Sequence, residues 1–533
     1  MATGTLASAQ TPVSASTKTS INSGALPSMG ENAELTAAAE RRIGDRIAAS
    51  IYRDPDYVDD PVLEDYMQGI WQPLMEAARV RGDLHAELQE RFAWNIFLIR
   101  DRSVNAFALP GGYFGVHLGL ISLGTSRDEL AAVLGHELSH VTQRHIARLI
   151  TQQTQQAPWL IGALILGALA AGKNPQLGNA AIVGGQAAAV QSQLNFSRDM
   201  EREADRVGFG VMTDAGFESR GVASMFEKLQ QAARLNDNGS FPYLRSHPLS
   251  TQRIAEVQAR LQLQPKAAAG PNKATDEESA KAQILYAMMA ARARVLADPG
   301  VDALHTMVEQ AQRLSGVSAM AASAVPVPTS VAPLSASAYS RDARSADSLY
   351  AGALAAGRLR DFALAQSFTN RLKPLAAGDL PAAKVIDLLA LELDLLAGKV
   401  PAQAERIDLV LATSRADVLL GAQALLAAGR AQAVSGRLQT WVTANPKDAR
   451  AWQLLAVAYS NLNQRVRSIR ADGEARVAQL DYAGALERFK AAQTMMHSNS
   501  GSADFVEGSI IDTRVRQMDL LVKEQALQDK LDR

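Results

Sequence analysis

The sequence predicts an α+β domain, mostly helical with a small sheet, followed by an all-α solenoid. A helical pattern of apolar residues at 37–52 precedes strand-like runs at 94–99 and 113–118. Alanine-rich helical phrases recur later in the chain, at 361–365 and again at 481–485. A chain of 533 residues is long enough for roughly three or four domains, each with its own core.

Composition divides the chain into four segments. Residues 1–33 are rich in Ala, Ser, Thr and Gly without a periodic apolar face, which predicts a disordered N-terminal segment. The α+β domain is expected at 34–263 and the repeat-like solenoid at 346–533. Residues 264–345 should hold linkers and connecting helices, with a helical break near Pro299.

Charge and cysteine content exclude several classes of function. The formal net charge is -1 and the isoelectric point is about 6.7, so the chain has no overall basic character for binding nucleic acid. No glycine-rich phosphate loop stands between a strand and a helix, which leaves nucleotide chemistry without support. The absence of cysteine excludes disulfides, thiol catalysis and zinc bound by thiolates, and it is compatible with an oxidising compartment.

The most informative motif is the stretch His136-Glu137-Leu138-Ser139-His140. Two histidines four residues apart on a helix share one face and can bind a single zinc ion, with the intervening Glu137 as general base of a peptidase. A capping box at 126–129 starts an apolar pattern, and we expect one helix from about 127 to 149. The alternative is a polar helical turn that spells this short motif by chance.

A catalytic zinc needs a third protein ligand, and the residues directly after the motif do not provide it. A metzincin would have Gly and His where this chain has Gln143 and Ile146. His145 lies five residues after His140, where helical rotation carries it off the ligand face. We therefore expect His145 to be a structural residue or one that supports a ligand.

A charged stretch at 197–206 offers a better third ligand. Glu201 and Asp205 lie four residues apart, on one face of an expected helix. Glu201 can ligate the metal while Asp205 accepts a hydrogen bond from a ligand histidine and fixes its tautomer. The alternative is an ordinary charged surface helix.

Three stretches, in this order, resemble the motifs of the M48 metallopeptidases: HELSHVTQRH, then SRDMEREADRVG, then SHPLS followed by Arg253. The chain is most similar to periplasmic members that join such a peptidase to tetratricopeptide repeats. The resemblance implies a zincin-type fold and one Zn²⁺ per chain, with Glu137 as the catalytic base. The implied zinc ligands are His136, His140 and Glu201. It also suggests a proton-donor role for Asp205, whereas the residue pattern favours the orienting role.

Two further segments match this family. Residues 105–112 correspond to a substrate-binding edge strand, so Asn105, Ala106 and Phe107 are expected to pair with extended substrate backbone. His247 corresponds to a histidine that can fill the open zinc position and hold the enzyme latent. Stabilisation of an oxyanion and simple packing before Pro248 are its alternative roles.

Location and membrane contact depend on weaker patterns. The resemblance implies a periplasmic protein, although residues 6–10 match only the end of a signal peptide and no complete signal is evident. The apolar run at 159–172 is shorter than the roughly 20 residues that span a bilayer. We expect it to form an apolar lid or to contact a membrane peripherally, and a buried core helix is the alternative.

Repeat patterns dominate the C-terminal part. Pro446 and Trp452 match the junction between two tetratricopeptide repeats, and Tyr459 follows at the expected spacing. The second-helix pattern carried by Phe489 arrives about 17 residues late, so we expect the repeat to be lengthened or interrupted near 465–477. A generic helical bundle is the alternative to this short solenoid.

Two functions are consistent with these patterns. The first is a zinc endopeptidase that degrades unfolded or stalled clients. The second is a chaperone-like adaptor with a latent or structural zinc site. Solenoids form concave protein-binding surfaces, and the resemblance suggests outer-membrane β-barrel proteins and their assembly machinery as partners. An intact Glu137 favours the enzyme, because a structural zinc site does not need a base.

Overall fold

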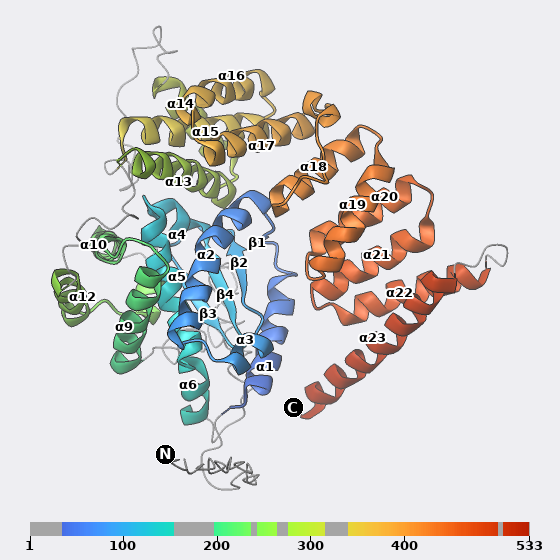
Figure 1. Cartoon of the computed structure of the whole chain (residues 1–533), viewed down its shortest axis with the longest axis horizontal. Helices are drawn as coiled ribbons and strands as arrows, with labels where there is room; N and C mark the ends of the chain where they lie inside the picture. Colours follow the sequence, from blue (N-terminus) through green and yellow to red (C-terminus); the bar gives the residue numbers. More distant parts are fainter. Residues whose placement is uncertain are drawn as a thin grey trace, which may run out of the picture. The chain divides into compact units, whose positions relative to one another are not determined.

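The computed structural model describes residues 35–153, 197–235, 242–263, 276–314, 339–498 and 505–531. The segment expected to be disordered, 1–33, and the apolar run at 159–172 lie outside these residues. Within the described part, helices predominate and one small sheet lies in the N-terminal half (Figure 1). None of the described helices combines the length and apolar character needed to cross a membrane.

The sheet has four strands in the order β1-β2-β4-β3. β1 (Tyr57–Val58) is antiparallel to β2 (Asn95–Ile99), and β2 is parallel to β4 (Tyr113–His117). β3 (Ala106–Leu109) is antiparallel to β4 and forms an edge of the sheet. The strands predicted at 94–99 and 113–118 are thus confirmed as β2 and β4. Gly111 and Gly112 have positive φ values of 74° and 78° in the turn before β4, a conformation that favours glycine.

Helices pack on the sheet and complete the core. α1 (Ala37–Ile51), capped by the Thr36 side chain, confirms the helix expected at 37–52. α2 (Pro61–Arg81) begins with Pro61 at a position where its missing N–H costs nothing, and its Trp71 ring lies 4.6 Å from that of Phe114. The other helices before the metal-motif helix are α3 (Ala86–Arg91) and α4 (Leu118–Leu123).

The single helix expected over 127–149 is wrong. α5 (Arg127–Thr142) ends after the motif, and α6 (His145–Gln153) starts a new helix. Arg144 adopts a φ of 55° between them, which breaks the α-helical path. The remaining helices of this half, among the described residues, are α9 (Arg198–Asp214), α10 (Arg220–Leu235), α11 (Tyr243–Ser246) and α12 (Thr251–Leu263).

The C-terminal half is all-helical among the described residues (Figure 1). The break expected near Pro299 is confirmed, because one helix ends at Ala297 and the next begins at Val301. α13 packs on both α4 and α15, and the Tyr286 hydroxyl donates to the carbonyl of Ile121 at 3.0 Å. The first helices and turns of this half are α13 (Asp276–Ala297), α14 (Val301–Leu314), α15 (Arg341–Arg358), α16 (Phe362–Leu372), η3 (Lys373–Ala376), α17 (Leu380–Leu396) and η4 (Ala402–Glu405).

Where the repeat was expected to be lengthened or interrupted, near 465–477, the structure has a complete additional helix. The later helices are α18 (Arg415–Ala427), α19 (Ala431–Ala444), α20 (Ala449–Asn461), α21 (Arg465–Ala478), α22 (Tyr482–Ser498) and α23 (Phe505–Leu531). Trp452 lies on α20 and Phe489 on α22, so a complete helix separates the two halves of the pattern. Gly473 of α21 leaves room for the Phe489 ring, since a Cβ there would lie 2.8 Å from it.

A buried ionic cluster joins the two halves of the chain. The Arg292 guanidinium on α13 donates to both Asp60 carboxylate oxygens at 2.6 and 2.8 Å, and to Glu392 of α17 at 2.7 Å. It also donates to the Tyr350 hydroxyl at 3.2 Å, and only 2% of Arg292 is exposed. We call these four residues the Arg292 cluster. Asp60 is also the N-cap residue of α2, so the Arg292 cluster connects the start of α2 to α13 and α17.

Candidate metal centre

The centre is built where α5 and α9 cross. Gly135 of α5 faces Gly208 of α9, and a Cβ on Gly208 would lie 2.9 Å from the backbone of Gly135. Two glycines therefore let the helix backbones approach more closely than side chains would permit. His136 directly follows Gly135, and Glu201 and Asp205 lie on the face of α9 that carries Gly208.

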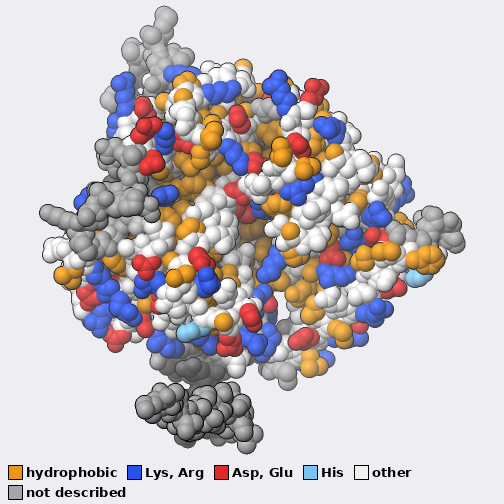
Figure 2. Space-filling view, viewed as in Figure 1, with side chains coloured by type: hydrophobic (Ala, Val, Ile, Leu, Met, Phe, Trp, Pro, Cys, Tyr) orange, Lys and Arg blue, Asp and Glu red, His pale blue; other side chains and the backbone are white. Residues whose placement is uncertain are grey.

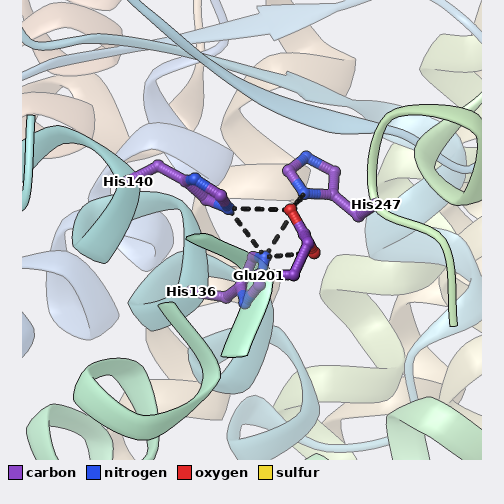
Figure 3. Close-up of side chains that lie close together, drawn as sticks. All are labelled: His136, His140, Glu201 and His247. Carbon is purple, nitrogen blue, oxygen red and sulfur yellow. Dashed lines mark hydrogen bonds and ion pairs between the residues drawn. The ribbon is translucent and has the colours of Figure 1, made fainter. Parts of the chain in front are cut away.

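Four buried side chains direct ligand atoms at one point (Figure 3). His136 Nε2 lies 3.0 Å from His140 Nε2 and 3.5 Å from Glu201 Oε2. Glu201 Oε1 lies 3.4 Å from His140 Nε2 and 2.9 Å from His247 Nδ1. All four ligand atoms lie within 4.8 Å of one another. Imidazole nitrogens and a carboxylate oxygen at this separation are a donor set that suits a divalent metal such as zinc.

The charges of the cluster also fit a cation. Burial alone would raise the pKa of Glu201, but His247, His136 and His140 together lower it below its usual range. Glu137 is fully buried, and no side chain among the described residues donates a hydrogen bond to its carboxylate. Its polar neighbours are the backbone of Ala108 and His247, whose Nε2 lies 3.4 Å from Oε1. Burial raises the pKa of Glu137. A buried carboxylate without a side-chain donor is costly for a protein, and a nearby metal ion would offset that cost.

The second nitrogen of His136 has its own partner. His136 Nδ1 lies 3.0 Å from Asp205 Oδ1, and Arg253 donates two hydrogen bonds to Asp205 at 2.6 and 2.8 Å. Arg253 Nη1 also lies 2.7 Å from Glu201 Oε2. Burial would lower the pKa of His136, but Asp205 and Glu201 raise it to about 10. The sequence motif contained Arg253 but did not indicate a role for it. In the structure its guanidinium contacts the carboxylates of both Asp205 and Glu201.

His145 does not point away from the ligands, contrary to the rotation expected from a continuous helix. Because the chain breaks at Arg144, His145 Nδ1 lies 2.9 Å from His140 Nδ1. Its Nε2 lies 3.0 Å from Glu203 Oε2, and burial lowers the pKa of His145 to about 4. His145 therefore contacts one of the proposed ligands, an arrangement that fits the supporting role left open by the sequence.

Comparison with known proteins finds a family match for part of the chain. Residues 71–261 match the model described as peptidase family M48. The chain contains an M48 peptidase domain. This stretch includes α5, α9 and His247, so the whole buried cluster lies inside the matched domain.

Three relatives extend the comparison. The chain is 29% identical over 488 residues to the beta-barrel assembly-enhancing protease of Escherichia coli K12, covering 89% of this chain and 88% of that protein. It is 33% identical over 262 residues to a putative beta-barrel assembly-enhancing protease of Vibrio cholerae, covering 49% of this chain and 52% of that protein. Mitochondrial metalloendopeptidase OMA1 of Arabidopsis thaliana is 31% identical over 197 residues, covering 37% and 36%. The chain thus combines an M48 peptidase domain with a later region that is all-helical among the described residues.

His247 directly follows α11, and its side chain belongs to the buried cluster of the candidate metal centre. Its backbone N–H donates to the carbonyl of Tyr243 at 2.9 Å, and the two rings stack with centroids 4.7 Å apart. Its Nδ1 faces Glu201, whereas its Nε2 lies 3.4 Å from Glu137 Oε1. The ring thus lies between the third ligand candidate and the base candidate.

The strand that was expected to bind substrate lies beside the candidate metal centre. Ala106 and Phe107 belong to β3, which packs beside α5, while Asn105 immediately precedes the strand. Asn105 accepts a backbone hydrogen bond from His117 at 3.0 Å. The Phe107 ring covers Gly115 of β4, where a Cβ would lie 2.1 Å from it. β3 is therefore an edge strand close to the helix that carries Glu137.

Proposed function

We propose that the protein is a zinc-dependent endopeptidase that cleaves misfolded or stalled outer-membrane proteins in the periplasm. It would assist their assembly through its C-terminal helices. The observation that supports this proposal most strongly is the convergence of His136, His140 and Glu201 next to the buried carboxylate of Glu137, to which no described side chain donates a hydrogen bond. A structural metal site has no use for such a carboxylate, whereas a hydrolytic site requires a base.

The three proposed zinc ligands are His136, His140 and Glu201, with one Zn²⁺ per chain. When bound, the zinc would supply Lewis acidity to a water molecule and to the scissile carbonyl. Two histidines, one carboxylate and an open position are the ligand set of several zinc peptidases.

Glu137 is the proposed base. Its burial raises its pKa, which makes it a better proton acceptor than an exposed carboxylate, and it would pass the proton on to the leaving amine. The Asp205 carboxylate would orient His136 by accepting a hydrogen bond from Nδ1 of that ring. Arg253 in turn donates a hydrogen bond to Asp205. Because this carboxylate already accepts from a histidine and an arginine, its geometry favours the orienting role over proton donation.

Substrate would bind in extended form along β3. An edge strand presents backbone N–H and C=O groups that pair with any peptide backbone, so affinity does not require a particular sequence. Asn105, Ala106 and Phe107 are the proposed contacts. Such loose specificity suits a protease whose clients share an unfolded state rather than a sequence motif.

Clients and location are inferred from the relatives. Two of them are named for enhancing β-barrel assembly, and one of these matches most of this chain. Stacked helix pairs like α20 and α21 resemble tetratricopeptide repeats and would present a surface for client proteins or the assembly machinery. Figure 2 shows Lys and Arg side chains intermixed with Asp and Glu over the visible face, which argues against nucleic acid as a partner there.

The experiment that tests the enzymatic proposal compares wild type with Glu137→Gln. Glutamine keeps the shape but cannot accept the proton, so cleavage of casein or of an unfolded β-barrel protein should fall by roughly 10²–10⁴-fold. Zinc content and circular dichroism should stay unchanged. Equal cleavage by the two proteins would exclude Glu137 as the base and would favour the second candidate, a chaperone-like adaptor.

His247 is proposed to be a latch that fills the fourth metal position. Its Nδ1 lies within the ligand cluster, which is the observation that favours latency over an oxyanion role. His247→Ala should therefore raise basal proteolysis, because substrate and water gain access to the metal. Rates are to be compared at equal zinc occupancy. A clear loss of turnover would show instead that His247 stabilises the transition state.

A further inference from the structure

The second ring nitrogen of His140 begins a chain of polar contacts that leads away from the metal centre. His140 Nδ1 lies 2.9 Å from His145 Nδ1, and His145 Nε2 lies 3.0 Å from Glu203 Oε2. Arg148 Nη2 donates to the same Glu203 oxygen at 2.8 Å. The side chains of His140 and His145 are completely buried, whereas about a third of Glu203 and Arg148 is exposed.

The position of each proton in this chain follows from the chemistry of imidazole. A neutral imidazole that donates its Nε2 lone pair to a metal carries its proton on Nδ1. His140 must then donate from Nδ1, and His145 must accept at Nδ1. His145 consequently carries its own proton on Nε2 and donates it to Glu203.

We propose that His145 is a positioning residue that fixes the tautomer and ring orientation of His140, with Glu203 as the carboxylate that ends the relay. This inference rests on the proposed function in one respect, namely that His140 binds zinc through Nε2. It assigns roles to two residues that neither bind the metal nor touch substrate.

The two ligand histidines are thus held in different ways. His136 donates directly to Asp205, whose side chain is 9% exposed and accepts two hydrogen bonds from Arg253. His140 reaches its carboxylate through an inserted imidazole. α5 has ended at Thr142, and the break in the helical path at Arg144 brings His145 Nδ1 to 2.9 Å from His140 Nδ1. A carboxylate and an intervening histidine together fulfil the role that one carboxylate fulfils at His136.

The primary test measures zinc affinity by competition with a chromophoric chelator. His145→Leu removes the acceptor at similar volume and should weaken zinc binding about 10–100-fold. His145→Asn places an oxygen near the position of the imidazole Nδ1 and should recover most of that loss. Asp199→Asn, on the exposed first turn of α9, is the matched control and should leave the affinity unchanged.

A second variant keeps the test independent of folding at the buried position. Glu203→Gln lies at the accessible end of the relay and should weaken zinc binding by roughly 2–10-fold, since it removes the charge but keeps an acceptor. The visible spectrum of the Co²⁺-loaded protein should change in His145→Leu and return in His145→Asn. A purely structural role would lower the unfolding temperature without changing the affinity or this spectrum.

The outcomes separate this inference from the proposed function. If wild type binds no zinc, or if His140→Ala binds it as tightly as wild type, the ligand assignment fails and the relay fails with it. If His140→Ala loses zinc but His145→Leu and Glu203→Gln retain wild-type affinity, the relay alone is overturned. An affinity in His145→Asn as low as in His145→Leu would also contradict the proposed acceptor role.

Discussion

Two buried clusters of charge in this chain are built in opposite ways. In the Arg292 cluster, one guanidinium donates to Asp60, Glu392 and Tyr350, so its charges and hydrogen bonds are matched by protein groups. In the metal centre, Glu137 is equally buried, yet neither of its oxygens accepts a hydrogen bond from a side chain of the described residues. In a buried cluster that stabilises the fold, the protein's own groups supply the hydrogen bonds of each charged side chain. In a cluster suited to catalysis, a carboxylate such as that of Glu137 keeps lone pairs that can accept a proton.

The same contrast appears in the pKa values. Asp60 and Glu392 raise the pKa of Arg292 above its usual value despite its burial, so this guanidinium stays charged at any physiological pH. In the metal centre, burial raises the pKa of Glu137 while neighbouring carboxylates raise that of His136 to about 10. The metal centre thus holds groups whose protonation responds to what binds there.

The largest expected effect concerns the Arg292 cluster. Arg292→Met removes the hydrogen-bonded counter-charge of the buried Asp60 and the partly buried Glu392, and should lower the free energy of unfolding by about 3–5 kcal/mol. Urea unfolding of the metal-loaded protein measures this loss. Arg313→Met, which removes an exposed ion pair with Glu309, is the control and should change the free energy by less than about 0.5 kcal/mol.

Zinc affinity provides the complementary measurement on this variant. Because the Arg292 cluster is separate from the ligand cluster, Arg292→Met should bind zinc as tightly as wild type. A large fall in affinity would show that the two clusters are coupled, and the contrast between them would then be incorrect.

Metal removal should have the next largest effect. At free zinc concentrations of 100 to 1,000 times the dissociation constant, binding stabilises the folded state by about 2.7–4.1 kcal/mol. Chelation should therefore lower the unfolding temperature of wild type. Glu201→Ala should show little further change on chelation, because a proposed ligand is already missing.

The smallest expected effect, for a change of one pH unit, is the pH dependence of zinc binding. In the metal-free protein the pKa of His136 is about 10, above its ordinary value of 6.5. The stabilisation from its proton is fully present below pH 6.5 and is lost as pH rises through 10. One proton leaves when zinc binds, so affinity should rise by up to about tenfold, or about 1.4 kcal/mol, per pH unit across this window.

A calorimetric titration at several pH values measures that slope. The slope should be unaltered in Arg292→Met, since the Arg292 cluster does not exchange protons in this range. A zinc affinity independent of pH between 6.5 and 9 would contradict the raised pKa of His136.

The sequence predicted what depends on local spacing. His136 and His140 share a face of α5 because the motif has helical spacing, and Glu201 and Asp205 share a face of α9 for the same reason. The strands β2 and β4 followed from short apolar runs. The roles assigned to these site residues stay predictions until the variants are measured.

What could not be predicted depends on backbone breaks and distant contacts. Arg144 follows Gln143 with neither Gly nor Pro nearby, so no residue indicated a positive φ or the return of His145 to His140. Glu203 lies two residues from Glu201 and resembled a surface carboxylate until His145 was placed beside it. Arg292 and Asp60 are 232 residues apart, a separation at which one sequence carries no pairing information.

The crossing of Gly135 and Gly208 has a consequence for how this protein can diverge. The two backbones approach closely because neither position has a side chain. A side chain at either position would push apart α5 and α9, which carry different proposed metal ligands. The distance between α5 and α9 therefore sets the distance between the proposed ligands that the two helices carry. His145, His247 and Arg253 reach the candidate metal centre from outside this crossing, so substitutions there can alter the centre without moving the two helices apart.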